Sequence, residues 1–185
     1  MINVNDFKTG VTIMFDGNIY QVLEFLHVKP GKGSAFVRSK LKNLRTGSTI
    51  EHTFNSGIKV ERAMIEKKTV QYLYNEGETF YFMDMETYDQ IPLDIKQIGE
   101  DIKYLKENLD VELIYFEEEI LGINLPEKVE LLVTKTEPAV RGNTATNALK
   151  EAILETSMVV KVPLFIEEGE TIIISTKDGK YVSRK

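Results

Sequence analysis

The chain has 185 residues, of which 42% are hydrophobic and 28% are charged, as is usual for a globular protein. It contains no cysteine, which excludes disulfides, thiolate catalysis and cysteine-based zinc or iron–sulfur sites. The formal net charge is −6, no run reaches the roughly 20 apolar residues of a membrane span, and no signal-peptide pattern opens the chain. We therefore expect a cytoplasmic protein with no membrane partner.

Charge is unevenly distributed along the chain. Residues 1–64 carry nine basic and five acidic residues, residues 65–126 five and fifteen, and residues 127–185 nine of each. No acidic residue lies between Glu24 and Glu51, whereas six basic residues do: Lys29, Lys32, Arg38, Lys40, Lys42 and Arg45. This pattern favours binding of RNA or phosphate by the N-terminal part, with a solvated strand face as the common alternative.

Short β-strands are the main elements that the sequence predicts. Runs rich in β-branched and aromatic residues recur between turn signals such as Asp16-Gly17 and Asp178-Gly179. We expect strands over 19–28, 35–41, 69–74, 79–83, 111–116, 129–133, 159–162, 171–174 and 180–182. Strands of this length and spacing are typical of small barrels or sandwiches.

The first two predicted strands and the segment between them read as a hairpin. Pro30 and Gly31 suit the two central positions of a type II turn, because proline presets φ and glycine supplies a positive φ. Lys32 then lies at the tip between two glycines. Arg38 and Lys40, two residues apart in the second strand, should share one face.

Two segments have helical character. Ile102, Leu105 and Leu109 fall on one helical face, which predicts a helix over 101–109. Residues 147–155 also have helical composition and spacing.

Catalytic and metal-binding patterns are weak. His27 and His52, the only histidines, lack a ligand-like spacing, so we interpret each as a strand residue. The run 117–119, three glutamates, lacks the interleaved glycines of a calcium loop and is interpreted as a solvated acidic turn. There is no phosphate-binding loop and no nucleophile elbow, so we predict that the protein is not an enzyme and holds no metal or cofactor.

Several segments, in order along the chain, resemble the elongation factor P family of bacteria. Residues 27–44 (HVKPGKGSAFVRSKLKNL) resemble its first domain, and residues 72–75 and 82–90 resemble its second. Residues 154–165, Gly169 and the ending 178–184 (DGKYVSR) are similar to its third.

This resemblance implies an all-β fold of three small barrels. An SH3-like (KOW-type) domain over 1–64 would be followed by OB-folds over 65–126 and 127–185, in an L-shaped arrangement like that of tRNA. It also implies the function of the family: binding to the 70S ribosome between the P and E sites, stimulation of peptide-bond formation and relief of stalling at consecutive prolines. The implied partners are P-site peptidyl-tRNA and ribosomal RNA, and we expect a monomer.

The resemblance assigns roles to individual residues. Lys32 would be the tip residue that meets the acceptor end of the peptidyl-tRNA and that a modifying enzyme can extend covalently. The loop would be shaped by Pro30, Gly31 and Gly33. Further RNA contacts would come from Lys29, Arg38, Lys40, Lys42 and Arg45 in the first domain, and from Gly142, Asn143, Thr144, Tyr181 and Arg184 in the third.

The chain departs from the family pattern in the third domain. Asn143 replaces the usual aspartate, which removes a charge, and Ser157 replaces a glycine at a position of positive φ, which predicts a rebuilt turn. The family has extended chain over 147–155, and we adopt that expectation over the helical one. Three other functions stay open: a paralogue with different stalling sequences, a general single-stranded RNA-binding module, and, as the weakest, an enzyme whose turnover depends on His27 or His52.

Overall fold

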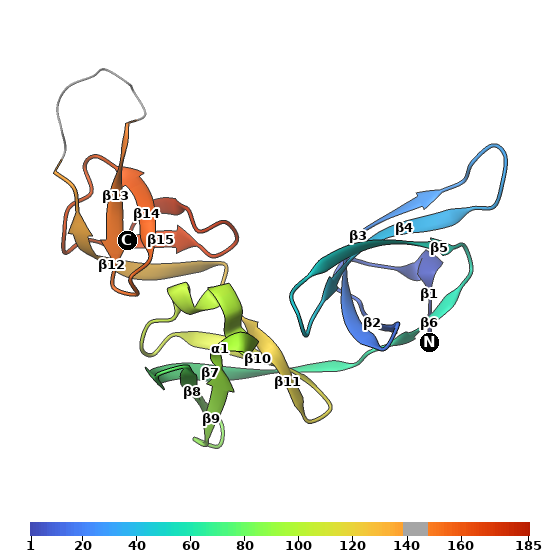
Figure 1. The fold of residues 1–185 in the computed structure, drawn as a ribbon, viewed down its shortest axis with the longest axis horizontal. Coiled ribbons are helices and arrows are strands. Elements are labelled where there is room, and N and C mark those ends of the chain that lie inside the picture. The colour runs from blue at the N-terminus through green and yellow to red at the C-terminus, as the bar shows by residue number, and fades with distance from the viewer. Residues whose placement is uncertain (139–147) are drawn as a thin grey trace. The chain divides into compact units, whose positions relative to one another are not determined.

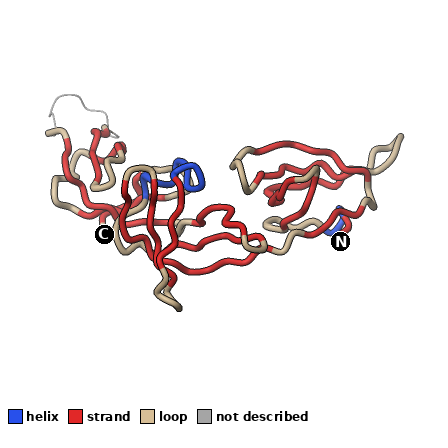
Figure 2. Tube along the Cα trace, turned by 60° about the horizontal axis from the view of Figure 1, so that its bottom comes forward, coloured by secondary structure: helices blue, strands red, loops and turns tan. Residues whose placement is uncertain are grey.

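The computed structural model describes residues 1–138 and 148–185, and β-strands make up most of its regular structure (Figure 1). Helical structure in the described residues is limited to two 3-10 helices, Val4–Asp6 (η1) and Gly99–Tyr104 (η2), and one turn of α-helix, Ile95–Ile98 (α1) (Figure 2). No helix in these parts of the chain is long and apolar enough to cross a membrane. The strands form three sheets, two of them curled into half-barrels, which confirms the all-β prediction.

The first sheet has six strands in the order β1-β6-β2-β3-β4-β5. They are β1 (Ile2–Asn3), β2 (Thr12–Phe15), β3 (Asn18–Val28), β4 (Phe36–Asn43), β5 (Thr49–Asn55) and β6 (Lys59–Arg62). Inward-facing side chains form one buried cluster that includes Ile13, Val22, Leu41 and Phe54. Because alternate residues of a strand point to opposite faces, the apolar positions of β4 enter this core and its basic positions face outward.

The turn between β2 and β3 confirms the Asp16-Gly17 signal. Phe15 pairs with Asn18, so the loop has two residues, and both have positive φ (51° and 74°). A two-residue loop with positive φ at both positions is the type I′ turn, which Asp-Gly favours.

The second sheet has five strands in the order β11-β10-β7-β8-β9. They are β7 (Ile65–Glu76), β8 (Thr79–Asp84), β9 (Gln90–Asp94), β10 (Asp110–Phe116) and β11 (Glu119–Asn124). The helix predicted over 101–109 is wrong: α1 occupies 95–98 and η2 occupies 99–104. Asp94 and Gln97 form a capping box that starts α1, and Gly99 ends it with a φ of 66°.

The third sheet has the order β14-β13-β12-β15-β16. Its strands are β12 (Lys128–Thr136), β13 (Leu149–Leu154), β14 (Val159–Pro163), β15 (Thr171–Ser175) and β16 (Tyr181–Arg184). The extended expectation for 147–155 is confirmed over 149–154, where Lys150, Ala152 and Leu154 are buried and the residues between them are exposed. Burial with a period of two has overridden the helical propensity of this segment.

The β13–β14 turn keeps the backbone shape that Ser157 was expected to disturb. Leu154 donates its N–H to the Met158 carbonyl, and Ser157 donates to the Leu154 carbonyl, both at 2.8 Å. Ser157 itself has a φ of 67°, so the turn is not rebuilt around the serine. Three-residue hairpin loops with a left-handed last residue have this pattern, and the serine bears the strain.

The chain forms two compact units: residues 1–67 with 113–122, and residues 68–112 with 123–185. In the first unit, Leu121 of β11 is buried against Ile19 and Ala63. In the second, Tyr104 of η2 belongs to the buried cluster of the third sheet, and Thr156 donates a hydrogen bond to the Lys103 carbonyl. Each unit therefore contains chain segments that are far apart in sequence.

Candidate RNA-contacting hairpin

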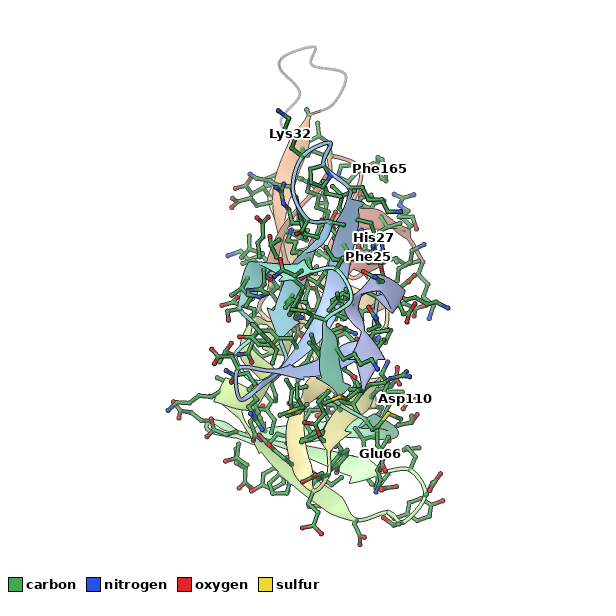
Figure 3. All side chains as sticks on the ribbon, turned by 90° about the vertical axis from the view of Figure 1, so that its right-hand side faces the viewer. Phe25, His27, Lys32, Glu66, Asp110 and Phe165 are labelled. Atoms are coloured by element: carbon green, nitrogen blue, oxygen red, sulfur yellow. The ribbon has the colours of Figure 1, made fainter. Side chains whose placement is uncertain are left out.

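Strands β3 and β4 form a hairpin arm whose tip lies beyond the last paired residues of the sheet. Their pairing ends at Val28 opposite Phe36, which leaves residues 29–35 as the loop (Figure 1). At the base of this loop, the Ala35 carbonyl accepts a hydrogen bond of 3.0 Å from the Ser56 N–H. Lys32 lies exposed at the tip, and its side chain points away from the strands (Figure 3). The predicted hairpin, with Lys32 at its tip, is thus observed.

The predicted type II turn at Pro30-Gly31 is wrong. That turn needs a positive φ at Gly31, whereas the positive φ of this loop, 102°, is at Gly33. A Cβ built on Gly33 would lie 4.0 Å from the Pro30 Cγ, so conformation rather than space favours glycine there. The chain reverses over a wider loop than a four-residue turn, with bends at 31–33.

Basic side chains follow the outer face of β4, as the alternation predicted. Arg38, Lys40 and Lys42 face outward, while Val37, Ser39 and Leu41 between them are buried. Cross-strand pairing then places acids beside the middle position, because Lys40 is opposite Glu24 on β3 and opposite Glu51 on β5. The segment that is free of acids in sequence is therefore not free of them in space.

Arg45 is already paired within the protein. Its Nε and Nη2 donate to the two carboxylate oxygens of Glu119, each at 3.0 Å, and Nη1 donates to the Gly17 carbonyl at 3.3 Å. These hydrogen bonds hold the pKa of Glu119 below its usual value and raise the pKa of Arg45. Because all three nitrogens of the guanidinium donate hydrogen bonds within the protein, few of its N–H groups remain available to a phosphate.

The uncompensated charge of the arm therefore extends from its tip along β4. Lys29, Lys32, Arg38 and Lys42 are all exposed, and none of them makes an ion pair within the described residues. The strand residues Arg38 and Lys42 also have no acidic residue opposite them, unlike Lys40. The sequence alone does not distinguish these four from Lys40 and Arg45, because cross-strand neighbours and partners distant in sequence decide the difference.

The remaining candidates of the first two domains are strand and turn residues. His27 lies on β3 and His52 on β5, as interpreted from sequence. The acidic run 117–119 begins as a turn, with a φ of 56° at Glu117, but Glu119 belongs to β11 and binds Arg45. In the described ranges, no group of three or more His, Asp or Glu side chains is arranged to hold a metal.

The third-domain candidates have different outcomes. Gly142, Asn143 and Thr144 lie outside the described residues. Tyr181, half-buried on β16, packs against the core of its sheet. The Arg184 guanidinium lies 4.5 Å from the centre of the Phe165 ring, pairs with Glu170 at 3.3 Å and donates to the Phe165 carbonyl.

Similarity to known proteins covers most of the chain. Three family models match this chain. The model for the elongation factor P KOW-like domain matches residues 3–60, the model for the elongation factor P OB domain matches residues 65–123, and the model for the elongation factor P C-terminal domain matches residues 129–184. Among solved structures, the eukaryotic translation initiation factor 5A from Methanococcus jannaschii is 28% identical, with a TM-score of 0.53 over 67% of this chain and 93% of that chain.

A translation initiation factor eIF-5A family protein from Naegleria fowleri has a TM-score of 0.50 at 17% identity. That match covers 67% of this chain and 96% of that chain, and at this identity it supports the fold alone. With three family models matched in their order along the sequence, the chain belongs to the elongation factor P family of non-enzymatic translation factors, which is related to initiation factor 5A.

Proposed function

We propose that this chain binds the ribosome between the P and E sites and relieves stalling at consecutive prolines by positioning the acceptor end of the peptidyl-tRNA through Lys32. Family membership implies ribosome binding. The observation that carries the finer proposal is the arm: an exposed lysine at its tip, flanked by glycines, with uncompensated positive charge around it. Such a tip can approach an RNA backbone closely, because glycine adds no side-chain bulk.

The proposed mechanism is positioning rather than proton transfer. The ring of proline fixes φ, which can hold a nascent chain in a geometry unfavourable for attack. The ribosome supplies the catalytic RNA, and a misplacement of about one ångström can cost on the order of a hundredfold in rate. The ammonium of Lys32 can bind phosphates and 2′-hydroxyls of the tRNA end and restore that geometry.

A covalent extension of Lys32 belongs to this proposal. The side chain is exposed at a loop tip, where a modifying enzyme can reach it. An intact-mass measurement of the native protein, with peptide mapping over 29–36, tests it. A mass above that of the sequence, localised to Lys32, is the expected result, and an unmodified native protein with full activity overturns it.

The other predicted contacts are proposed at two places. On the arm, Lys29, Arg38, Lys40 and Lys42 would meet the acceptor side of the tRNA, and Pro30, Gly31 and Gly33 would shape the loop. In the third domain, Gly142, Asn143, Thr144, Tyr181 and Arg184 would lie near the small subunit. We also propose that the chain has three domains, over residues 1–64, 65–126 and 127–185, and that it is a cytoplasmic monomer.

The decisive experiment compares two alanine variants on a reporter that contains three consecutive prolines. Lys32→Ala should keep measurable ribosome binding and lose rescue, because the arm stays folded while its tip group is gone. Lys59→Ala is the matched control, since it removes an exposed lysine from another strand of the same sheet, β6. Full rescue by Lys32→Ala contradicts the proposal.

The alternative function, general binding of single-stranded RNA, is tested by binding measurements on the wild-type protein and the same two variants. A general single-stranded RNA-binding module would bind free oligonucleotides about as tightly as ribosomes carrying P-site tRNA. We expect a marked preference for the ribosome. Ribosome profiling of a strain that lacks the protein distinguishes the proposed factor from a paralogue with different stalling sequences. Pauses at sequences other than consecutive prolines would favour the paralogue.

A further inference from the structure

Phe25 and His27 form an aromatic pair on β3, directly before the loop that carries Lys32. Their ring centres are 5.6 Å apart and their planes are inclined by 80°, an edge-to-face arrangement. Figure 3 shows both residues along the arm below Lys32. Phe25 is half-buried and packs against the buried cluster of the first sheet, so it holds the His27 ring on a fixed support.

The two histidines differ in what surrounds them. His52 lies between two aromatic neighbours, with ring centres 4.5 Å from Phe15 and 4.5 Å from Phe54, and is half-buried. His27 has Phe25 as its aromatic neighbour and is exposed, and its side chain makes no hydrogen bond or ion pair within the described residues. The fold explains His52 as packing, but it gives the exposed ring of His27 no such role.

The cations nearest to His27 in sequence are those of the loop. His27 is paired with Val37, a residue of the inner face of the sheet, whereas Glu24 and Glu51 flank Lys40 on the outer face. These two acids are therefore on the other side of the sheet, as are the basic side chains of β4. Lys29 and Lys32, both exposed, follow His27 within the loop.

We propose that His27, supported by Phe25, is a stacking platform for an unpaired RNA base, with Lys29 binding the adjoining phosphate. An aromatic face beside lysines is the arrangement by which proteins bind single-stranded RNA, because every base has a π-face and every nucleotide a phosphate. The inference rests on the proposed function, under which this base belongs to the unpaired 3′ end of the P-site tRNA. A duplex would not serve, since its bases are stacked on one another.

The test measures the affinity of labelled factor for ribosomes with two kinds of P-site tRNA: intact, or lacking the unpaired 3′ nucleotides. His27→Ala should bind ribosomes with intact tRNA roughly tenfold more weakly than the wild type, within the range of base–aromatic stacking. On truncated tRNA the two proteins should bind equally. His27→Phe, which keeps an aromatic face, should retain the wild-type preference for intact tRNA.

Leu26→Ala is the matched control. Leu26 is the neighbouring residue on β3, is 57% exposed and is paired with Arg38 on the outer face, so its removal should leave both affinities unchanged. Equal thermal unfolding of the variants shows that the arm remains folded. Unchanged affinity of His27→Ala, or an equal loss in His27→Phe, overturns the stacking role.

The Lys32→Ala variant, assayed in parallel on the proline reporter, separates this inference from the proposed function. Loss of rescue by Lys32→Ala with no effect of His27→Ala overturns the platform alone. Full rescue by Lys32→Ala overturns the proposed function, whatever His27→Ala does.

Discussion

Gly179, in the turn between β15 and β16, combines two constraints that exclude a side chain. Its φ is 72°, and a Cβ there would lie 3.0 Å from the Tyr104 hydroxyl oxygen and 3.3 Å from the Met158 Cε. Tyr104 is only 3% exposed, so it has little room to move. We expect Gly179→Ala to lower the free energy of unfolding by about 2–4 kcal/mol, from the left-handed backbone and the crowding together.

Gly169, in the connection between β14 and β15 of the same sheet, provides the control for this prediction. Its φ is 86°, but a Cβ there would meet no atom within 4 Å. Gly169→Ala should therefore cost only the backbone term, about 1–2 kcal/mol. Urea unfolding of both variants measures the difference, and equal losses would mean that Tyr104 gives way at no cost.

Asp84, a buried carboxylate at the end of β8, should make stability depend on acid pH. The backbone N–H groups of Glu86 and Thr87 donate to its Oδ1 at 2.8 and 3.2 Å and hold its pKa below the usual value, and Lys68 at 3.9 Å acts in the same direction. Because the folded pKa is depressed, this contribution to stability is complete above the unfolded pKa of about 3.9 and is lost as the pH falls through the folded one.

The substitution Asp84→Asn removes the charge and keeps an oxygen for the two N–H donors. We expect the variant to be less stable than the wild type near neutral pH and equally stable at a pH below the folded pKa of Asp84. Urea unfolding over this pH range measures the gap between the two proteins. A gap that stays constant with pH would show that the loss comes from packing instead of ionisation.

The extended elements were largely predictable, and the helical one was not. Strands such as β3 and β4 follow from alternation, and the Asp16-Gly17 turn from its composition. The prediction of a helix over 101–109 is wrong because it rests on the spacing of apolar residues alone and takes no account of the residues that start and end helices. Those signals were in the sequence: the capping residues Asp94 and Gln97, and then Gly99, mark the short helix that exists.

The β10–β11 hairpin is an element whose packing sequence alone did not reveal. The ion pair of Glu119 with Arg45 joins it to the β4–β5 turn, and Leu121 is buried with Ile19 and Ala63. We expect the apolar contact to dominate, because exposed ion pairs stabilise little. Leu121→Ala should lower the free energy of unfolding by about 2–5 kcal/mol, and Glu119→Gln by much less.

Hydrogen exchange over 113–122, together with urea unfolding, measures this prediction. Leu121→Ala should also speed exchange in the hairpin, since local opening becomes easier when buried contacts are lost. Glu119→Gln is the matched control for Leu121→Ala, because it changes a residue two positions away on the same strand. If Glu119→Gln had the larger effect, the ion pair would be the main attachment.

For the whole molecule, the distribution of charge predicted an RNA-binding end but not which residues provide it. The N-terminal 64 residues have a net charge of +4 in a chain of −6, and this was visible in the sequence. Which cations are available depends on the strand register, which sets Glu24 and Glu51 beside Lys40, and on Glu119, far along the chain, which occupies Arg45. Pairings of this kind are invisible until the fold is known.

The available cations can be counted by the salt dependence of ribosome binding. The logarithm of the binding constant falls linearly with the logarithm of salt concentration, and each phosphate contact adds to the slope. Arg38→Ala should make the slope shallower by about one unit, because its exposed guanidinium is free to meet a phosphate. The double variant Arg45→Gln/Glu119→Gln removes an ion pair at constant net charge, and should leave the slope unchanged. A shallower slope in the double variant would mean that Arg45 leaves Glu119 to bind RNA, and that the positive surface extends beyond β4 to the β4–β5 turn.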